Sequence, residues 1–195
     1  MFDNRKNQAK NNISADSSWV MLLDTDIYFE ESILENLFQH LTKNQDIGML
    51  CANGIEVIKK HGFRKFKRRF RDVKEVINVG NKHTFLTQHH YYDTYAFRDS
   101  NGNQFWPSCT FHRCHKCNTS KDQKSTANLE IVKSAFGGIA LIHPSIISNP
   151  LINWSGYSEE GKTQCEHVAF CKAIYDHTNF LVAIARDAEC YWEIP

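Results

Sequence analysis

The chain has 195 residues, of which 42% are hydrophobic and 23% are charged, and its formal net charge at pH 7 is +1. This length and composition are typical of one globular domain with its own core, and the near-neutral charge supplies no overall field that would favour nucleic acid or an anionic membrane. Seven cysteines at irregular spacing do not indicate a small disulfide-linked secreted protein, so we expect reduced thiols.

The amino-terminal segment, "MFDNRKNQAKNNIS", is polar and lacks the apolar stretch of a signal peptide or a membrane span. We therefore expect a cytoplasmic protein with no transmembrane segment. A dense run of Lys and Arg, "KKHGFRKFKRRFRDVK" at 59–74, departs from the near-neutral charge. Such a run is usually a solvated helix face, and we expect no nucleic-acid binding because the rest of the chain adds no excess of positive charge.

The first half of the chain predicts alternating strands and helices, which favours an α/β layered fold. A buried strand at 19–23 precedes an amphipathic helix at 30–41, and a second strand at 47–57 is interrupted by Asn53-Gly54. Aromatic and β-branched residues at 84–97 predict one or two further strands.

The second half begins with an inserted polar loop at about 99–128. After it, "KSAFGGIALIHPSII" combines a glycine pair with an apolar strand that ends at Pro144. Residues 165–177 predict a helix with one apolar face, and 179–192 predict a last strand. Because no repeat or linker divides the chain, we expect a single domain over 1–195.

Two carboxylates end the first apolar run, "WVMLLDTDIYF", at Asp24 and Asp26. In an extended chain, residues i and i+2 point to the same side, so both would project from the carboxyl end of the strand, where open α/β sheets bind ligands. Their repulsion is best offset by a cation, and oxygen ligands favour Mg²⁺ or Mn²⁺. An Asp N-cap for the next helix is the alternative, and it accounts for only one of the two.

Four segments carry a family resemblance. "LLDTDIYF" followed by an acidic helix resembles the DxD segment of GT-A glycosyltransferases. "HHYYDTYAFRDSNG" and "VKSAFGGIALIHPSII" resemble segments of the fungal capsule-associated mannosyltransferases and related bacterial and large-virus glycosyltransferases, and "CEHVAFCKAI" lies where the family's late acidic motif precedes a helix. The resemblance implies a GT-A-like mixed sheet flanked by helices. It also implies metal-dependent transfer of a sugar from a nucleotide-sugar donor to a glycan or other hydroxyl acceptor.

The resemblance also assigns roles to individual residues. Asp26 would hold the divalent ion, and Asp24 would contact the ion or the donor ribose. Gly137 and Gly138 would let the backbone approach the donor sugar or the acceptor, although a tight turn between loop and strand explains them equally well. Glu166 would act as the general base of an inverting reaction, or it is simply a first-turn helix glutamate.

Three further residues complete the expected site. GT-A enzymes usually have Asp where this chain has His167, so His167 is a second candidate for the catalytic position. Asp93 and Arg98, in "YYDTYAFRD", would line the acceptor side, with a strand-end salt bridge as the alternative.

A phosphatase is the first rival interpretation. The opening motif also resembles that of the haloacid-dehalogenase phosphatases, in which Asp24 would attack phosphate and Asp26 would act as the acid. Tyr28 stands where that family usually has Thr or Val, and no late paired-aspartate segment follows.

A zinc-binding interaction module is the second rival. "CTFHRCHKC" places Cys109, His112, Cys114 and Cys117, with His115, at the short spacing of a tetrahedral Zn²⁺ site. The alternative is free thiols in a polar loop, and a zinc ion here would brace the loop rather than define the function.

The segment before Asp24 differs from the family pattern. In GT-A enzymes, strands that precede the DxD hold the nucleotide, whereas here the preceding segment is short and polar. We expect the carboxyl-terminal half of a GT-A-like domain that lacks the N-terminal nucleotide-binding strands, is inactive alone, and is completed by an upstream polypeptide.

Overall fold

The computed structural model describes residues 18–58, 73–79, 82–91, 93, 95–104, 128–158 and 160–192. Eight strands and three helices lie in these ranges: β1 (Val20–Leu23), β2 (Ile27–Tyr28), α2 (Ser32–Lys43), β3 (Ile47–Ile58), β4 (Val73–Val79), β5 (Lys82–Tyr91), β6 (Leu129–Val132), β7 (Ile139–Ile142), α4 (Pro144–Ser148), α5 (Glu166–His177) and β8 (Leu181–Trp192). Our predictions for the amino-terminal segment, for the basic run up to residue 72 and for the Cys/His motif lie outside the described residues.

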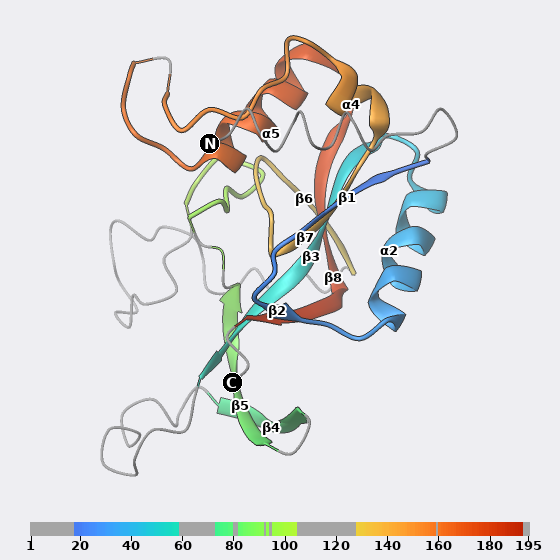
Figure 1. Cartoon of the computed structure of the whole chain (residues 1–195), viewed down its shortest axis with the longest axis vertical. Helices are drawn as coiled ribbons and strands as arrows, with labels where there is room; N and C mark the ends of the chain where they lie inside the picture. The colour runs from blue at the N-terminus through green and yellow to red at the C-terminus, as the bar shows by residue number, and fades with distance from the viewer. Residues whose placement is uncertain are drawn as a thin grey trace.

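All eight strands belong to one mixed sheet, drawn in Figure 1. Its main order is β1-β7-β3-β5-β4, and β8 pairs with β2, β3 and β6. β3 and β8 are parallel, whereas β7 is antiparallel to both β1 and β3. Strands β1, β3 and β8 therefore run in the same direction, and β1 ends where Asp24 begins the candidate site.

Helix α2 covers one face of the sheet (Figure 1). Its residues Ile33, Leu37 and Leu41 are spaced four apart, so they form one apolar stripe that is buried. They pack in one core cluster with strand residues that include Ile139 and Leu141 of β7. This layer accounts for the amphipathic pattern seen in the sequence.

Helices α4 and α5 cover the opposite face. Phe170 and Ile174 of α5 pack in a second core cluster with Ala140 and Ile142, the alternate residues of β7. Since successive strand side chains point to opposite faces, the all-apolar sequence of β7 matches a strand that is buried on both sides. The Tyr175 hydroxyl donates to the Val132 carbonyl at 2.6 Å and so ties α5 to β6.

The α/β layered fold predicted from periodicity is confirmed: the chain forms a mixed sheet with helices on both faces. None of the helices in the described ranges combines the length and apolar character needed to cross a membrane.

Two local predictions were wrong. The strand at 19–23 exists, but it ends the main strand order, and its residues Met21 and Leu23 are 44% and 42% exposed rather than buried. Asn53-Gly54 does not interrupt β3, which continues to Ile58. The irregularity lies in the partner strand β8 instead, where the register jumps beside Asn53.

Candidate functional site

Asp24 lies immediately after β1, in backbone that is no longer a strand. Its amide N–H donates to the Gly138 carbonyl at 2.9 Å, which extends the β1–β7 pairing by one bond. Asp26 lies in the turn that follows and is exposed. The rule that side chains alternate along an extended strand therefore does not govern these two carboxylates.

Gly137 and Gly138 form a turn just before β7, with φ angles of +69° and +85°. Residues with a Cβ rarely adopt this left-handed conformation, so the glycine pair predicted from the sequence is required by the backbone itself. The turn presents the carbonyl of Gly138 to Asp24, and the Gly137 N–H donates to the Asp93 carboxylate.

Asp93 is a buried carboxylate with a perturbed pKa. Burial raises its pKa to about 6, and the nearby charges of Asp24 and Glu166 contribute to the rise, while hydrogen bonds from the N–H groups of Ala96 and Gly137 oppose it. The Ala96 N–H lies 3.2 Å from the Asp93 Oδ1 atom. The fold thus brings together Asp24, Asp93 and Glu166, which come from three separate regions of the sequence.

Glu166 is the first residue of α5, and Cys165 is its N-cap. The positive end of the helix dipole favours a carboxylate at this position. Burial raises the pKa of the Cys165 thiol to about 11, and the charges of Asp93 and Glu166 contribute, which places this end of α5 beside the carboxylates.

His167 points into the core instead. Its ring is stacked on Phe136, with centroids 4.1 Å apart and an interplanar angle of 7°, and the residue is only 5% exposed. This is the environment of a packing residue at the base of the site. Of the two candidates for the catalytic position, Glu166 is the one that acts electrostatically on Asp93.

Arg98 is held by its own loop. Its guanidinium donates to the carbonyls of Phe97 at 2.6 Å and Tyr95 at 3.1 Å, and burial lowers its pKa. Its backbone pairs with Ser134 in an isolated bridge. Arg98 therefore shapes the segment that carries Asp93.

Two residues near the site were not predicted from the sequence. The Trp192 indole N–H donates to Asp26 Oδ2 at 2.9 Å, and the Cys190 thiol lies 3.0 Å from the Gly137 carbonyl oxygen. Both belong to β8. Neither lies in a recognisable motif, and only the pairing of β8 with the rest of the sheet brings them here.

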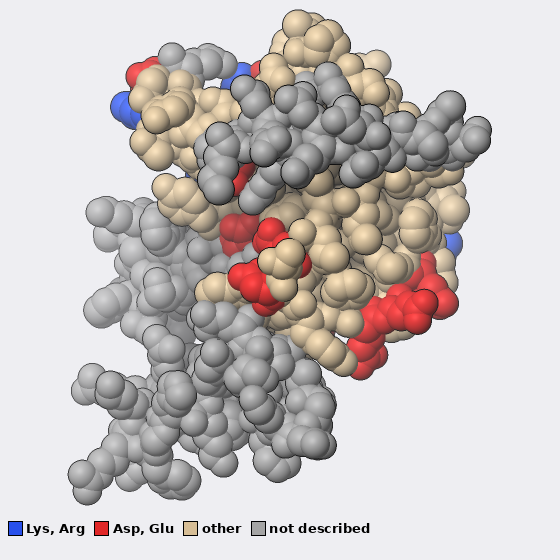
Figure 2. Space-filling model, viewed as in Figure 1, with Lys and Arg blue, Asp and Glu red and all other residues tan. Residues whose placement is uncertain are grey.

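The acidic side chains that Figure 2 shows on one face of the molecule include a group near the start of α2 and a group near the middle, beside the point where β1 ends and β2 begins. Within the part of the chain that the structure describes, no three His, Cys, Asp or Glu side chains lie close enough to hold a metal ion as they stand. Asp24 and Asp26, the two residues predicted to hold a metal, carry carboxylate oxygens, the ligand type that Mg²⁺ or Mn²⁺ prefers.

No protein-family model matches the chain, and no curated protein matches it.

Proposed function

We propose that the chain is a metal-dependent glycosyltransferase with a GT-A-like fold, which transfers a sugar from a nucleotide-sugar donor to a glycan or other hydroxyl acceptor. The convergence of Asp24, Asp93 and Glu166 beside the Gly137-Gly138 turn carries the proposal. A cluster of carboxylates, of which Asp93 has a raised pKa because of burial, next to backbone that a substrate can approach closely, is a typical arrangement of a functional site.

In this proposal the acidic groups have different tasks. Asp24, with Asp26 of the turn that follows it, would supply oxygen ligands to Mn²⁺ or Mg²⁺. When bound, the ion supplies positive charge that stabilises the leaving nucleoside diphosphate. Glu166, the first residue of α5, would accept the proton of the acceptor hydroxyl.

Asp93 would lie on the acceptor side, between the other two carboxylates. Two backbone N–H groups fix its orientation. Because each carboxylate oxygen has two lone pairs, Asp93 retains the capacity to accept a hydrogen bond from a sugar hydroxyl. The Gly137-Gly138 turn has no side chains, so the substrate can contact its peptide groups directly.

The edge of the sheet supports the proposed upstream partner. Among the described strands, β1 pairs only with β7, and its apolar residues Met21 and Leu23 are partly exposed. An edge of this kind accepts a further strand. We propose that an upstream polypeptide pairs with β1 and completes the nucleotide site.

A thermal-shift screen tests the function. UDP, GDP and CDP are each added with MnCl₂ or with EDTA, to the chain alone and to the chain co-expressed with the segment encoded upstream of it. We expect one nucleotide to raise the melting temperature only with Mn²⁺, by the amount that its affinity and concentration dictate. Absence of a metal-dependent shift with every nucleotide in both preparations would refute the proposal.

Asp24→Asn is the matched variant for this screen, because it removes the charge and keeps the side-chain shape. We expect it to abolish the Mn²⁺-dependent shift. Asp176→Asn is the control: Asp176 forms an exposed pair with Lys172 in α5, and its loss should leave the shift unchanged. A phosphatase would instead hydrolyse p-nitrophenyl phosphate in the presence of Mg²⁺ and show no preference among nucleotides.

A further inference from the structure

Strand β8 contains a bulge of three residues. Ala52 of β3 pairs with Ala185, but the next residue, Asn53, pairs with Glu189, so residues 186–188 have no partner in β3. A bulge shifts every later residue of its strand relative to the neighbouring strand, and it re-aims the side chains that follow. The position of the last residues of β8 therefore depends on this irregularity.

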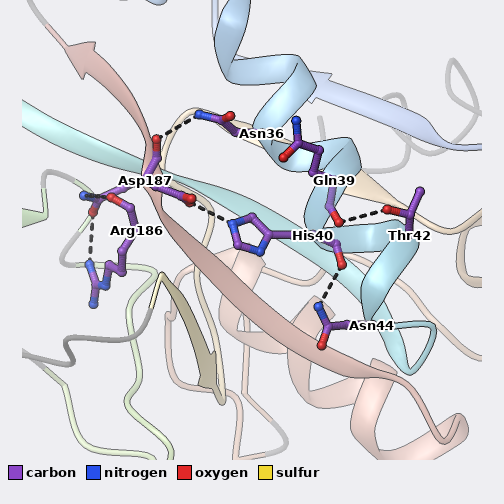
Figure 3. Close-up of polar contacts among 8 residues, drawn as sticks. Asn36, Gln39, His40, Thr42, Asn44, Arg186 and Asp187 are labelled. Carbon is purple, nitrogen blue, oxygen red and sulfur yellow. Dashed lines mark hydrogen bonds and ion pairs between the residues drawn. The ribbon is translucent and has the colours of Figure 1, made fainter.

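Polar contacts hold the bulge from two sides (Figure 3). On one side, Arg186 donates from Nε to Glu130 Oε2 at 2.7 Å and from Nη1 to Asn53 Oδ1 at 3.0 Å. On the other side, Asp187 contacts His40 Nε2 of α2 at 2.8 Å. These contacts come from three separate elements, β6, β3 and α2, and they hold the bulge in place. They therefore help to fix the register of β8 beyond the bulge.

Beyond the bulge, the Cys190 side chain lies under the glycine turn. Its sulfur is 3.0 Å from the Gly137 carbonyl oxygen, and the residue is fully buried. Burial, with the charge of Asp24, raises the pKa of this thiol to about 12, so it stays protonated and donates the hydrogen bond. Two other buried thiols differ. The contacts of the Cys171 sulfur with Met49 Sδ and with the Ala135 carbonyl oxygen are both longer, at 3.8 Å. For Cys51, burial is the largest cause of the raised pKa.

The thiol completes the support of the turn. The Gly137 N–H donates to Asp93, the Gly137 carbonyl accepts from Cys190, and the Gly138 carbonyl accepts from the Asp24 N–H. Glycine backbone has wide conformational freedom, so a two-glycine turn keeps one geometry only if its peptide groups are fixed from outside. Cys190 supplies the hydrogen bond from β8 to the turn.

We propose that Cys190 is a positioning residue, whose thiol hydrogen bond to Gly137 fixes the glycine turn between Asp24 and Asp93. The role rests on the proposed function, since the turn is where the substrate would approach the backbone. Cys190 makes no contact with substrate in this scheme and acts only through the peptide groups of the turn.

The test compares Cys190→Ala, which removes the donor, with Cys190→Ser, which keeps one, and with Cys171→Ala as a control for the loss of a buried thiol. Hydrogen exchange of the Asp24 and Gly137 amides is measured by NMR. We expect exchange about fivefold faster in Cys190→Ala, which corresponds to one modest hydrogen bond. We expect wild-type rates in Cys190→Ser and Cys171→Ala. Equal exchange in Cys190→Ala and Cys171→Ala, or no rescue by Ser in a folded protein, would overturn the proposal.

A second measurement needs no folded alanine variant. The S–H stretching band of Cys190, identified by its loss in Cys190→Ser, should lie at lower frequency than that of Cys171, because a short hydrogen bond weakens the S–H bond. Equal frequencies would contradict the short contact and the proposed role.

The functional consequence is measured separately. In the preparation that binds a nucleoside diphosphate with Mn²⁺, Cys190→Ala should weaken binding about fivefold and Cys190→Ser should restore it. If the wild-type protein binds no nucleotide, the proposed function fails, while the exchange rates and the S–H frequencies still decide whether Cys190 positions the turn.

Discussion

Replacing Asp93 with asparagine should make the protein more stable at neutral pH while removing the proposed glycosyltransferase activity. The pKa of Asp93 is about 6 in the folded protein, compared with 3.8 for an ordinary Asp. The folded state therefore binds a proton more tightly than the unfolded state, and stability falls as the pH rises from about 4 to about 6. Above that range, the ionised Asp93 costs the folded protein roughly 3 kcal/mol.

A side-chain amide cannot ionise, so Asp93→Asn avoids this cost. The variant loses about 1 kcal/mol, because the amide oxygen cannot serve both backbone N–H groups as well as the carboxylate does. The net expectation at pH 7.5 is a gain of about 2 kcal/mol, which raises the melting temperature of a chain of this size by about 4 to 8 °C. Below about pH 4.5 the wild-type cost becomes smaller than the lost hydrogen bond, so the order of stability should reverse.

Melting temperatures measured from pH 4 to pH 8 test this reasoning. The curves of wild type and Asp93→Asn should cross, whereas Asp176→Asn should follow the wild type throughout. Mn²⁺-dependent sugar transfer by the chain co-expressed with its upstream segment, measured over the same pH range, should be lost in Asp93→Asn. A variant that is less stable than wild type at pH 7.5, or a stability difference that does not change with pH, would refute the proposed free-energy cost of ionising Asp93.

Three other predictions follow from single contacts or motifs. Asp26→Asn keeps an oxygen for the Trp192 indole N–H, so it should leave the melting temperature unchanged and abolish Mn²⁺-dependent nucleotide binding; undiminished binding would exclude Asp26 from the metal site. Gly48→Ala should destabilise the protein by about 2 kcal/mol in urea unfolding, because the new Cβ would lie 2.4 Å from Phe180 Cβ; an unchanged midpoint would contradict that packing. The polar loop at about 99–128 should hold one zinc ion per chain by elemental analysis of protein purified without chelator, and metal-free protein with fully reactive thiols would exclude the site.

The layers of the fold could be predicted because the longer helices and the central strands have strong local patterns. The apolar stripe of α2 and the continuous apolar run of β7 predict one-sided and two-sided burial, and the structure has both. Strands β2, β4 and β6 and helix α4 were missed. Strands β2 and β6 and helix α4 are only two to five residues long, so their periodicity is too short to be distinguished from a loop or a strand end. Strand β4 begins at the end of the basic run, which was interpreted as a helix face.

The exposure of β1 could not be read from its sequence. A short apolar run predicts a strand, but it does not say whether the strand lies in the centre of the sheet or at its edge. That depends on which strands pair, and in the described chain β1 pairs with β7 alone. The apolar side chains that suggested a buried strand are therefore partly exposed at an edge.

The residue types of the candidate site were more predictable than their partners. The spacing of Asp24 and Asp26 suggested that both side chains project together from the end of an extended strand, but the chain turns after Leu23. Burial, with a contribution from the charge of Asp24, raises the pKa of Asp93, and Asp26 accepts a hydrogen bond from Trp192. These pairings result from sheet register, which the sequence specifies only through the packing of the whole fold. The three-residue bulge of β8 has the same origin: its partners come from distant segments, so no local pattern marks it. A motif can therefore identify the carboxylates of this site, whereas the bulge affects where Cys190 and Trp192 of β8 lie beside them.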